Sequence, residues 1–308
     1  MTKRIDVHHH PSPPSYLEAR SGRDYRYPAQ VGWSVQKSLD DMAAGGVSTA
    51  MLSLPHASAI WPADRAEARR LCRGWNEFMA KLAADHPGRF GVFAALPALD
   101  IEGSLAEIAY ALDTLKADGV TLMTNIGDRW LGDPHYAPIF EELHRRKAVV
   151  YTHPVAPDCC RGITPEINDA VIEYGTDTTR AIAKLVFTGS ARRYKDIRFI
   201  FSHAGGTLPY IAERFLFAHR NNRKGEQQNV PEGVIPTLNT FYYDTAQAAH
   251  VHAMESFRRL IKLSQLVFGS DFPYRSSEEH VTGLSKCGFS EAELRAIDFE
   301  NAERLLKR

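Results

Sequence analysis

The chain has 308 residues, of which 44% are hydrophobic and 24% are charged, and its 37 acidic residues balance its 37 basic ones. A formal net charge of zero favours neither nucleic acid nor an anionic membrane as a partner. No apolar run reaches the roughly 18 residues of a membrane span, and the N-terminus leads into a strand pattern rather than a signal sequence, which indicates a cytoplasmic protein. The length fits two average domains or one α/β barrel.

The first predicted strand, residues 4–10, ends in three consecutive histidines and is followed by a proline-rich stretch, residues 11–14. Because side chains alternate along a strand, Asp6, His8 and His10 are expected on one face. Two imidazoles side by side at a strand end suit a divalent metal ion. An expression remnant or a solvated surface run is the alternative. The triplet, however, closes an apolar strand, and prolines end the pairing there.

Helices and strands alternate along the rest of the chain. After a polar segment predicted as a loop (residues 15–31), helical spacing predicts helices at 33–44, 66–84, 104–117, 136–146, 167–191, 208–220 and 251–263. Short apolar strands are predicted at 47–54, 89–96, 119–124, 148–153, 197–203, 241–244 and 265–269. Residues 219–229 read as an exposed insertion, and two helices, 278–286 and 290–307, end the chain.

Eight apolar strands joined by helices indicate a parallel sheet that is covered on its outer side. This pattern predicts one closed (β/α)8 TIM barrel spanning residues 1–308. A doubly wound open sheet is the alternative, but it would show fewer strands and, for dinucleotides, a glycine-rich turn after the first strand. Histidines occupy that turn here, and Gly205 and Gly206 after strand six do not form the dinucleotide-binding pattern.

Polar side chains recur at the carboxyl ends of the predicted strands, where barrel enzymes carry their chemistry. They are His8 and His10 after strand one, His153 after strand five, His203 after strand six and Asp271 after strand eight. Each alone could be structural, a hydrogen-bonded histidine or a turn-forming aspartate. Together they indicate a catalytic site for zinc or a similar first-row metal, because neutral imidazoles and a carboxylate are its usual ligands.

Four motifs carry a family resemblance: Asp-x-His-x-His on strand one, Tyr-Thr-His-Pro, His-Ala-Gly-Gly and Gly-Ser-Asp-Phe-Pro. They resemble the amidohydrolase superfamily, in the branch of aminocarboxymuconate-semialdehyde, γ-resorcylate and 6-methylsalicylate decarboxylases, over essentially the whole chain. The resemblance implies His8, His10, His153 and Asp271 as ligands of one divalent metal ion, with zinc preferred and manganese the alternative. It places His203 beside the metal-bound water or substrate, and it implies a homodimer or homotetramer.

Two departures from related branches bear on the metal and the substrate. Binuclear members bridge their metals with a carboxylated lysine after strand four, but residues 119–126 contain no lysine, so one metal is expected. Strand one reads His-x-His where some phenolic-acid decarboxylases of the branch have Glu-x-His. The substrates of those enzymes therefore do not transfer directly.

The resemblance implies non-oxidative decarboxylation of a small aromatic carboxylate of the salicylate type, with Asp271 protonating the ring carbon that bears the carboxylate. A hydrolase or hydratase is the alternative. There the metal would lower the pKa of its water towards about 7 for attack on a carbonyl or alkene, while Asp271 and His203 move protons. A metal-binding protein without catalysis is the third class, and it would need no pocket.

Arg214 lies 11 positions after His203, a spacing that resembles the carboxylate-binding arginine of aminocarboxymuconate-semialdehyde decarboxylase, which serves the neighbouring subunit. A helix from residue 207 would carry Arg214 roughly 10 Å along its axis, away from its own strand end. The alternative is a surface arginine that is paired with a nearby acid such as Glu213 or is solvated. Loop residues that could line the pocket, or pack elsewhere, are Tyr16, Trp61, Arg161 and Phe272.

Overall fold

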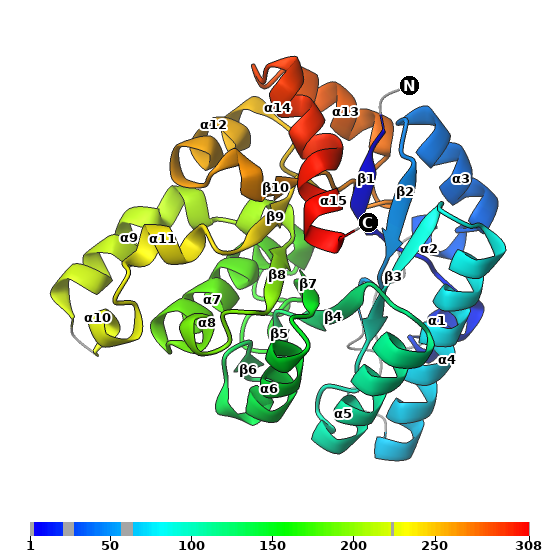
Figure 1. Cartoon of the computed structure of the whole chain (residues 1–308), viewed down its shortest axis with the longest axis horizontal. Coiled ribbons are helices and arrows are strands. Elements are labelled where there is room, and N and C mark those ends of the chain that lie inside the picture. The colour runs from blue at the N-terminus through cyan, green and yellow to red at the C-terminus, as the bar shows by residue number, and fades with distance from the viewer. Residues whose placement is uncertain (1–2, 21–27, 57–63, 223–224, 308) are drawn as a thin grey trace.

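A computed structural model of the chain describes residues 3–20, 28–56, 64–222 and 225–307. Eight parallel strands follow one another around a barrel in the order β1-β2-β3-β4-β7-β8-β9-β10 (Figure 1). A backbone hydrogen bond of 2.9 Å from Val7 N to Phe268 O joins the first and last strands. The predicted (β/α)8 barrel is thus confirmed. Its strands are β1 (Ile5–His9), β2 (Thr49–Leu52), β3 (Phe90–Ala95), β4 (Gly119–Met123), β7 (Val149–His153), β8 (Arg198–Phe201), β9 (Tyr242–Asp244) and β10 (Leu266–Val267).

Helices lie between successive strands and cover the outside of the barrel. Several begin at a capping side chain: Ser34, Asp64 and Asp100 each accept a hydrogen bond from the backbone N–H three residues on. None of the described helices combines the length and the apolar character that crossing a membrane requires. The main helices are α3 (Val35–Ala44), α4 (Arg65–Asp85), α5 (Ile101–Ala109), α6 (Ala137–Arg145), α7 (Glu173–Phe187), α9 (Leu208–Asn221), α12 (Val251–Leu260), α13 (Ser277–Ser285), α14 (Glu291–Arg295) and α15 (Asn301–Leu306).

Two segments predicted as loops contain short helices. The first segment, residues 15–31, contains most of α1 (Pro14–Ala19) and all of α2 (Pro28–Val31). The second, the insertion at 219–229, contains the last residues of α9 and the whole of α10 (Glu226–Asn229). Polar composition hides such short helices, because packing stabilises them more than local propensity does; α1 contacts α4, and α10 contacts α7 and α9.

Three further elements differ from the sequence-based expectation. The helix predicted over 167–191 is interrupted at Gly189, whose φ of 75° ends α7 before a short α8 (Ser190–Arg193). A small antiparallel hairpin, β5 (Asn125–Ile126) with β6 (Arg129–Trp130), follows β4. A short helix, α11 (Val234–Leu238), precedes β9.

The apolar core has an outer and an inner part. The outer part lies between the strands and the helices, while the inner part fills the amino end of the barrel. Ala302 and Leu305 of α15 pack against this inner cluster and cover that end. The other buried members of the inner cluster are Ile5, Val7, Met51, Phe93, Val149, Tyr151, Ile200 and Val267. A substrate can therefore approach the barrel interior only from the carboxyl end.

Strand β1 changes face between Asp6 and His9. Asp6 pairs with Ala50 and His9 with Leu52, so β1 uses one residue more than β2 over this stretch, which is a bulge. Val7 faces the inner core, yet the next side chain, His8, also points inward, onto the ring of Tyr151. The prediction that Asp6 shares a face with His8 and His10 is therefore wrong.

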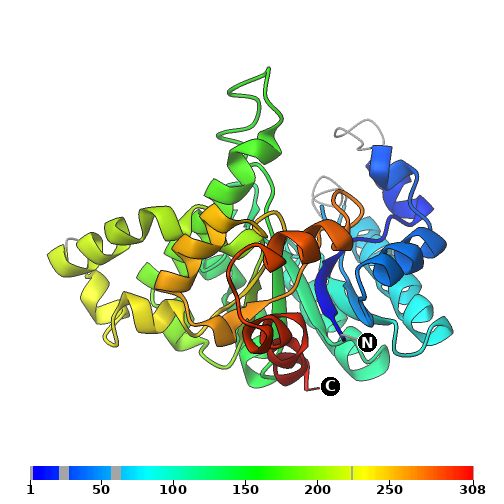
Figure 2. The same ribbon diagram turned by 90° about the horizontal axis from the view of Figure 1, so that it is seen from above.

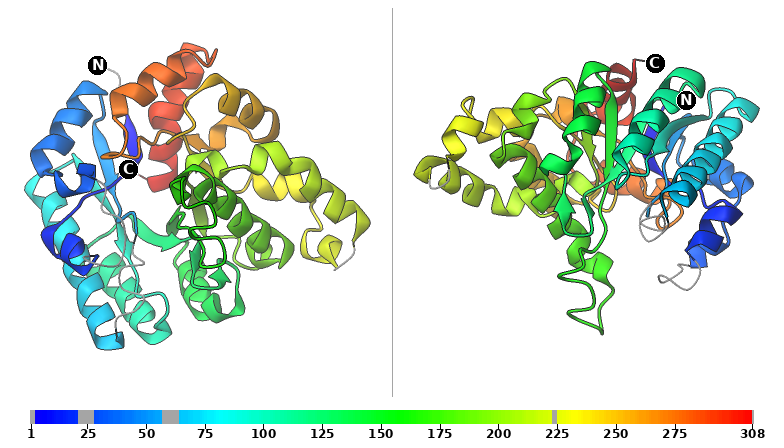
Figure 3. Two further views of the ribbon diagram at one scale, coloured as in Figure 1. Left: turned by 180° about the vertical axis from the view of Figure 1, so that it is seen from behind. Right: turned by 90° about the horizontal axis from the view of Figure 1, so that it is seen from below.

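One segment, residues 154–172 between β7 and α7, projects from the carboxyl end. Figure 2 shows it on the side of the molecule opposite to α15 and the C-terminus, and the view from below in Figure 3 shows the same projection. Four of its large apolar side chains are exposed: Ile163, Ile167, Val171 and Ile172.

Candidate metal centre

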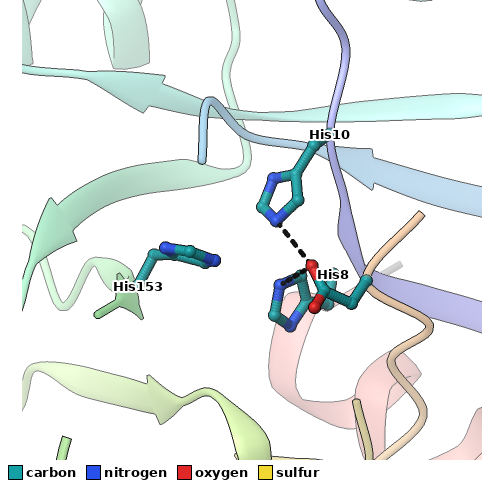
Figure 4. A group of neighbouring side chains, drawn as sticks. His8, His10 and His153 are labelled. Atoms are coloured by element: carbon teal, nitrogen blue, oxygen red, sulfur yellow. Dashed lines mark ion pairs between the residues drawn. The ribbon is translucent and has the colours of Figure 1, made fainter. Parts of the chain in front are cut away.

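Four side chains from three strand ends converge at the carboxyl end of the barrel. His8 lies in β1, His10 directly follows it, His153 ends β7 and Asp271 follows β10. One ligand atom from each lies within 4.8 Å of the others, and all four residues are buried. Figure 4 shows the three imidazoles around a common point, with dashed lines for the ion pairs of His8 and His10 with Asp271. The structure thus brings together the four residues that are expected as metal ligands from their positions at the ends of strands.

Each of the three imidazoles is held through its Nδ1 atom. His10 Nδ1 lies 2.8 Å from Ser53 O, and His153 Nδ1 lies 2.9 Å from Pro154 O. Carbonyl oxygens only accept hydrogen bonds, so these Nδ1 atoms carry the proton and donate it. His8 Nδ1 lies 2.8 Å from the carboxylate of Asp244, which orients the ring in the same way. When the three rings are neutral, their Nε2 lone pairs face the centre, as metal-binding histidines require.

Three buried atoms at this centre have no hydrogen bond: His8 Nε2, His10 Nε2 and Asp271 Oδ1. Oδ1 of Asp271 lies 3.1 Å from His8 Nε2 and 3.3 Å from His10 Nε2. Buried polar atoms without partners are costly, and in the neutral form that binds a metal the Nε2 lone pairs would face the carboxylate oxygen and repel it. A cation among them would satisfy all three, so the donor set fits a divalent metal ion.

The pKa values of the histidines at this centre shift in opposite directions. Burial opposes a charged ring at His8, but the carboxylates of Asp244 and Asp271 outweigh burial and raise its pKa to about 10. Burial would also raise the pKa of Asp271, yet the imidazoles of His8, His10 and His203 hold it well below the usual value. Burial and the surrounding imidazoles lower the pKa of His153 far enough to keep that ring neutral.

His203 lies beside the four-residue group rather than within it. Its Nε2 is 3.6 Å from Oδ2 of Asp271, the carboxylate oxygen that points away from the other imidazoles. The residue follows β8 in a left-handed conformation (φ 55°), and its backbone N–H donates to Asp244 Oδ1 at 2.9 Å. This geometry agrees with the expected position of His203 next to the metal site.

A cavity of about 700 Å³ opens above the centre. Six of its lining residues define the chemistry of its floor and walls: His56, His153, Tyr174, His203, Gln247 and Asp271. The candidate lining residues Tyr16, Arg161 and Phe272 do not face it, and Trp61 lies outside the described residues. Phe272 instead stacks on His9 at 4.7 Å between ring centroids.

Three residues of the site are not predicted by the sequence analysis. Asp244 is the last residue of β9 and holds His8, so its place at a strand end could have identified it. His56 follows β2 within a Pro-His pair, and its ring centroid lies 5.6 Å from that of His153. Gln247 donates to Asp271 from the loop after β9, and no motif marks it in the sequence.

The end of β4 carries a structural network where binuclear relatives have a lysine. Thr124 and Asn125 both donate to Asp177, which is buried, and Trp130 Nε1 adds a third hydrogen bond at 2.6 Å. Within the described ranges, one group of side chains has the geometry of a metal site. Both observations fit the expectation of a single metal ion.

Arg214 lies on the exposed side of α9 and does not line the cavity. Its neighbour Glu213 forms an ion pair with Arg220, so the predicted Glu213–Arg214 pair is absent, whereas the alternative of a solvated surface arginine stays open. Arg214 borders a shallow hollow together with Glu213 and Phe217. Its side chain is therefore on the outer surface of the protein and not at the cavity.

Comparisons with known proteins agree with this picture. A decarboxylase of Penicillium terrestre, macB, is 36% identical over 293 residues, which cover 89% of this chain and 85% of that protein. A 6-methylsalicylic acid decarboxylase of Aspergillus aculeatus is 36% identical over 279 residues, or 88% of this chain and 84% of that protein. A dihydroxybenzoic acid decarboxylase of Polaromonas, solved with manganese and the inhibitor 2-nitroresorcinol, has the same fold, with a TM-score of 0.86, 23% identity and coverage of 100% and 97%. The amidohydrolase family model matches residues 5–308, and the chain belongs to the amidohydrolase family.

Proposed function

We propose that this protein is a metal-dependent decarboxylase that releases CO₂ from an o-hydroxybenzoate of the 6-methylsalicylate type. The observation that carries the proposal is the arrangement of Asp271. One of its oxygens faces the imidazoles of His8 and His10, while the other faces His203 and the cavity. Two relatives that are named 6-methylsalicylic acid decarboxylases, at 36% and 34% identity, support the substrate class.

His8, His10, His153 and Asp271 are the ligands in this proposal. Three imidazoles and one carboxylate suit zinc, and manganese is the alternative, since a structural relative binds it. When bound, the ion would offset the negative charge on the carboxylate and phenolate oxygens of the substrate. Hydrogen bonds to Ser53 O, Pro154 O and Asp244 keep the three rings oriented for this purpose.

Asp271 and His203 handle the proton. Asp271 is ionised at rest, so it first takes up a proton from His203 and then passes this proton to the ring carbon that bears the carboxylate; a C–H bond forms and the ring loses its aromaticity. The C–C bond to the carboxylate then breaks, its electron pair returns to the ring, and CO₂ leaves. His203, at 3.6 Å from Asp271 Oδ2, is placed to return a proton to the carboxylate for the next cycle.

The alternatives have less support. The relatives favour decarboxylation over a lactonase, amidohydrolase or hydratase, although the same groups could activate water. A protein that only stores or senses metal would need no substrate cavity, whereas this centre lies at the floor of one of about 700 Å³. The hydrolase alternative predicts an acid and an alcohol or amine, or a hydrated product, without CO₂.

The test is a small substrate panel with the purified protein. We expect 6-methylsalicylate, salicylate or 2,6-dihydroxybenzoate to yield CO₂ and the corresponding phenol in equal amounts, with the Asp271→Asn protein as the inactive control. Metal analysis of the same preparation identifies zinc or manganese. A hydrated or hydrolysed product without CO₂ would make the hydrolase alternative the better one.

We also propose a homodimer or homotetramer in which Arg214 of one subunit binds the substrate carboxylate in its neighbour. On α9, Tyr210 is 91% exposed and Phe217 is 53% exposed, and Arg214 lies between them on the same face. Tyr210 and Val171 also line the mouth of the cavity, so a partner that covers this face would reach the substrate. Among the described residues, Arg214 has no ion-pair partner of its own.

Subunit mixing tests the shared site. Arg214→Ala and Asp271→Ala proteins should each be nearly inactive, and a mixture under exchanging conditions should regain part of the activity. A mixed dimer contains one site with its own Asp271 and its partner's Arg214 intact. If subunit exchange is confirmed but no activity returns, or if the Arg214→Ala protein is fully active, Arg214 is a surface residue without a role in the site.

A further inference from the structure

We infer that Gln247 is a positioning residue for Asp271. Its amide holds Oδ2 of the carboxylate, so that Oδ1 stays directed at the imidazoles of His8 and His10. The inference rests on the proposed function for its kinetic part, whereas its effect on metal affinity stands on the geometry alone.

The contact with Asp271 is direct. Gln247 Nε2 donates to Asp271 Oδ2 at 2.7 Å, which is shorter than the 3.6 Å between that oxygen and His203 Nε2. Gln247 thus makes the shortest contact to this oxygen. A hydrogen bond from an amide to a carboxylate is charge-assisted and therefore stronger than one between neutral groups. A carboxylate with one oxygen held in this way has one oxygen left to direct at a metal.

Arg275 decides which way the amide of Gln247 faces. Arg275 Nη1 donates to Gln247 Oε1 at 3.1 Å, and an arginine can only donate. The oxygen of the amide must therefore face Arg275, which leaves Nε2 towards Asp271. Glu279 holds Arg275 in turn through two hydrogen bonds, one of them 2.8 Å from Nε. The orientation of the donor thus follows from the network.

The backbone of Gln247 is also fixed. Its φ is 56°, a left-handed value that a glutamine adopts only when its surroundings require it. Its backbone N–H donates to His280 Nε2 at 3.0 Å, and the other nitrogen of that ring bonds Ser276 O at 2.9 Å. Strain at a residue that contacts a reacting group is typical of functional sites.

Gln247 also lies in the wall between two hollows. It borders the catalytic cavity and a second groove, of about 770 Å³, that Arg275, Glu279 and His280 help to line. An exposed glutamine ordinarily samples several rotamers, yet both ends of this amide are bonded. The amide of Gln247 is therefore held in place beside Asp271, although the side chain also borders the second groove.

The experiment replaces Gln247 by methionine, which keeps the length of the side chain and removes the donor. We expect Gln247→Met to bind zinc about tenfold to a hundredfold more weakly, measured by competition with a chromophoric chelator. At saturating zinc, kcat should fall about tenfold while KM changes by less than about twofold. Gln36→Met is the matched control, because it removes a glutamine–aspartate bond, to Asp40 at 2.8 Å on α3, outside the site. The control should leave both quantities unchanged.

A second pair of variants tests the role of Arg275. Arg275→Met should reduce zinc affinity less than Gln247→Met does, since the amide remains but can turn. The double variant should be no weaker than Gln247→Met alone, because Arg275 acts through Gln247. Additive losses would overturn this link. If Gln247→Met has a low melting temperature, Gln247→Glu replaces it in the test. The glutamate keeps the contact with Arg275 but presents an oxygen to Asp271, so the loss of zinc affinity should be equal or larger.

The outcomes separate this inference from the proposed function. Zinc affinity can be measured without a substrate. If the wild-type protein releases no CO₂, the proposed function is contradicted, but the zinc affinities of the wild type and of Gln247→Met still test the role of Gln247. Equal zinc affinity and equal kcat in the wild type and in Gln247→Met overturn the inference, whatever the reaction proves to be.

Discussion

The interior of the barrel is filled by apolar side chains at its amino end and by ionisable side chains at its carboxyl end. At the amino end, Met51, Phe93 and Val267 belong to one apolar cluster with Ala302 and Leu305 of α15. At the carboxyl end, His8, His10, His153, Asp244 and Asp271 are equally buried. The two ends thus share a backbone and a degree of burial but not a chemistry.

The difference shows how the fold separates stability from function. Apolar packing needs no ligand, because every contact is made within the chain. The carboxyl end leaves buried atoms of His8, His10 and Asp271 without hydrogen bonds, which disfavours the folded state until a cation occupies the site. Substitutions at the amino end should accordingly change the free energy of unfolding, whereas those at the carboxyl end should change metal affinity and catalytic rate.

Removal of a ligand should give the largest effect. His153→Ala is expected to lose the metal and to lower the rate of CO₂ release by about a thousandfold or more. His8→Ala and Asp271→Ala should do the same, Asp271→Ala through lost metal or lost proton transfer. Metal content and rate are measured on one preparation, with circular dichroism as the folding control. Full activity in a metal-free variant would contradict the scheme.

His203→Asn should lower the rate by roughly a hundredfold while the metal stays bound, because His203 lies beside Asp271 rather than among the four converging ligand atoms. Rate and metal content are again measured together. A folded His203→Asn protein without metal would instead make His203 a ligand.

Asp244→Asn should weaken metal binding by about tenfold to a hundredfold. An amide at this position can present its N–H₂ group to His8 Nδ1, which would move the ring proton to Nε2 and remove the lone pair that faces the metal. Chelator competition gives the affinity. An unchanged affinity would mean that the ring of His8 keeps its orientation without the carboxylate.

The smallest effect on catalysis is expected at the amino end. Leu305→Ala in α15 should cost about 2–5 kcal/mol of unfolding free energy, because Leu305 is 1% exposed within the inner core. Urea unfolding measures this loss, while kcat and metal affinity of the folded protein should match the wild type. A parallel loss of activity would show that the two ends are coupled.

Much of the site could be predicted from the sequence because of one property of a closed parallel barrel. All carboxyl ends of its strands meet at one face, so a residue that follows a predicted strand lies near every other such residue. The positions of His153, His203 and Asp271 after their strands predict their place in the site without any assumption about side-chain direction. The order of the strands needed only the alternation of apolar strands with amphipathic helices.

Only the tertiary structure decided which side chains support these residues. Asp6 appeared to share a face with His8 until the bulge in β1 placed it against His9 and Ser270. Asp244 and Gln247 act through partners far along the chain, since 236 residues separate Asp244 from His8. Strand periodicity reports the local path of the backbone, whereas a bulge and a long-range hydrogen bond depend on how neighbouring strands align, which no single segment encodes.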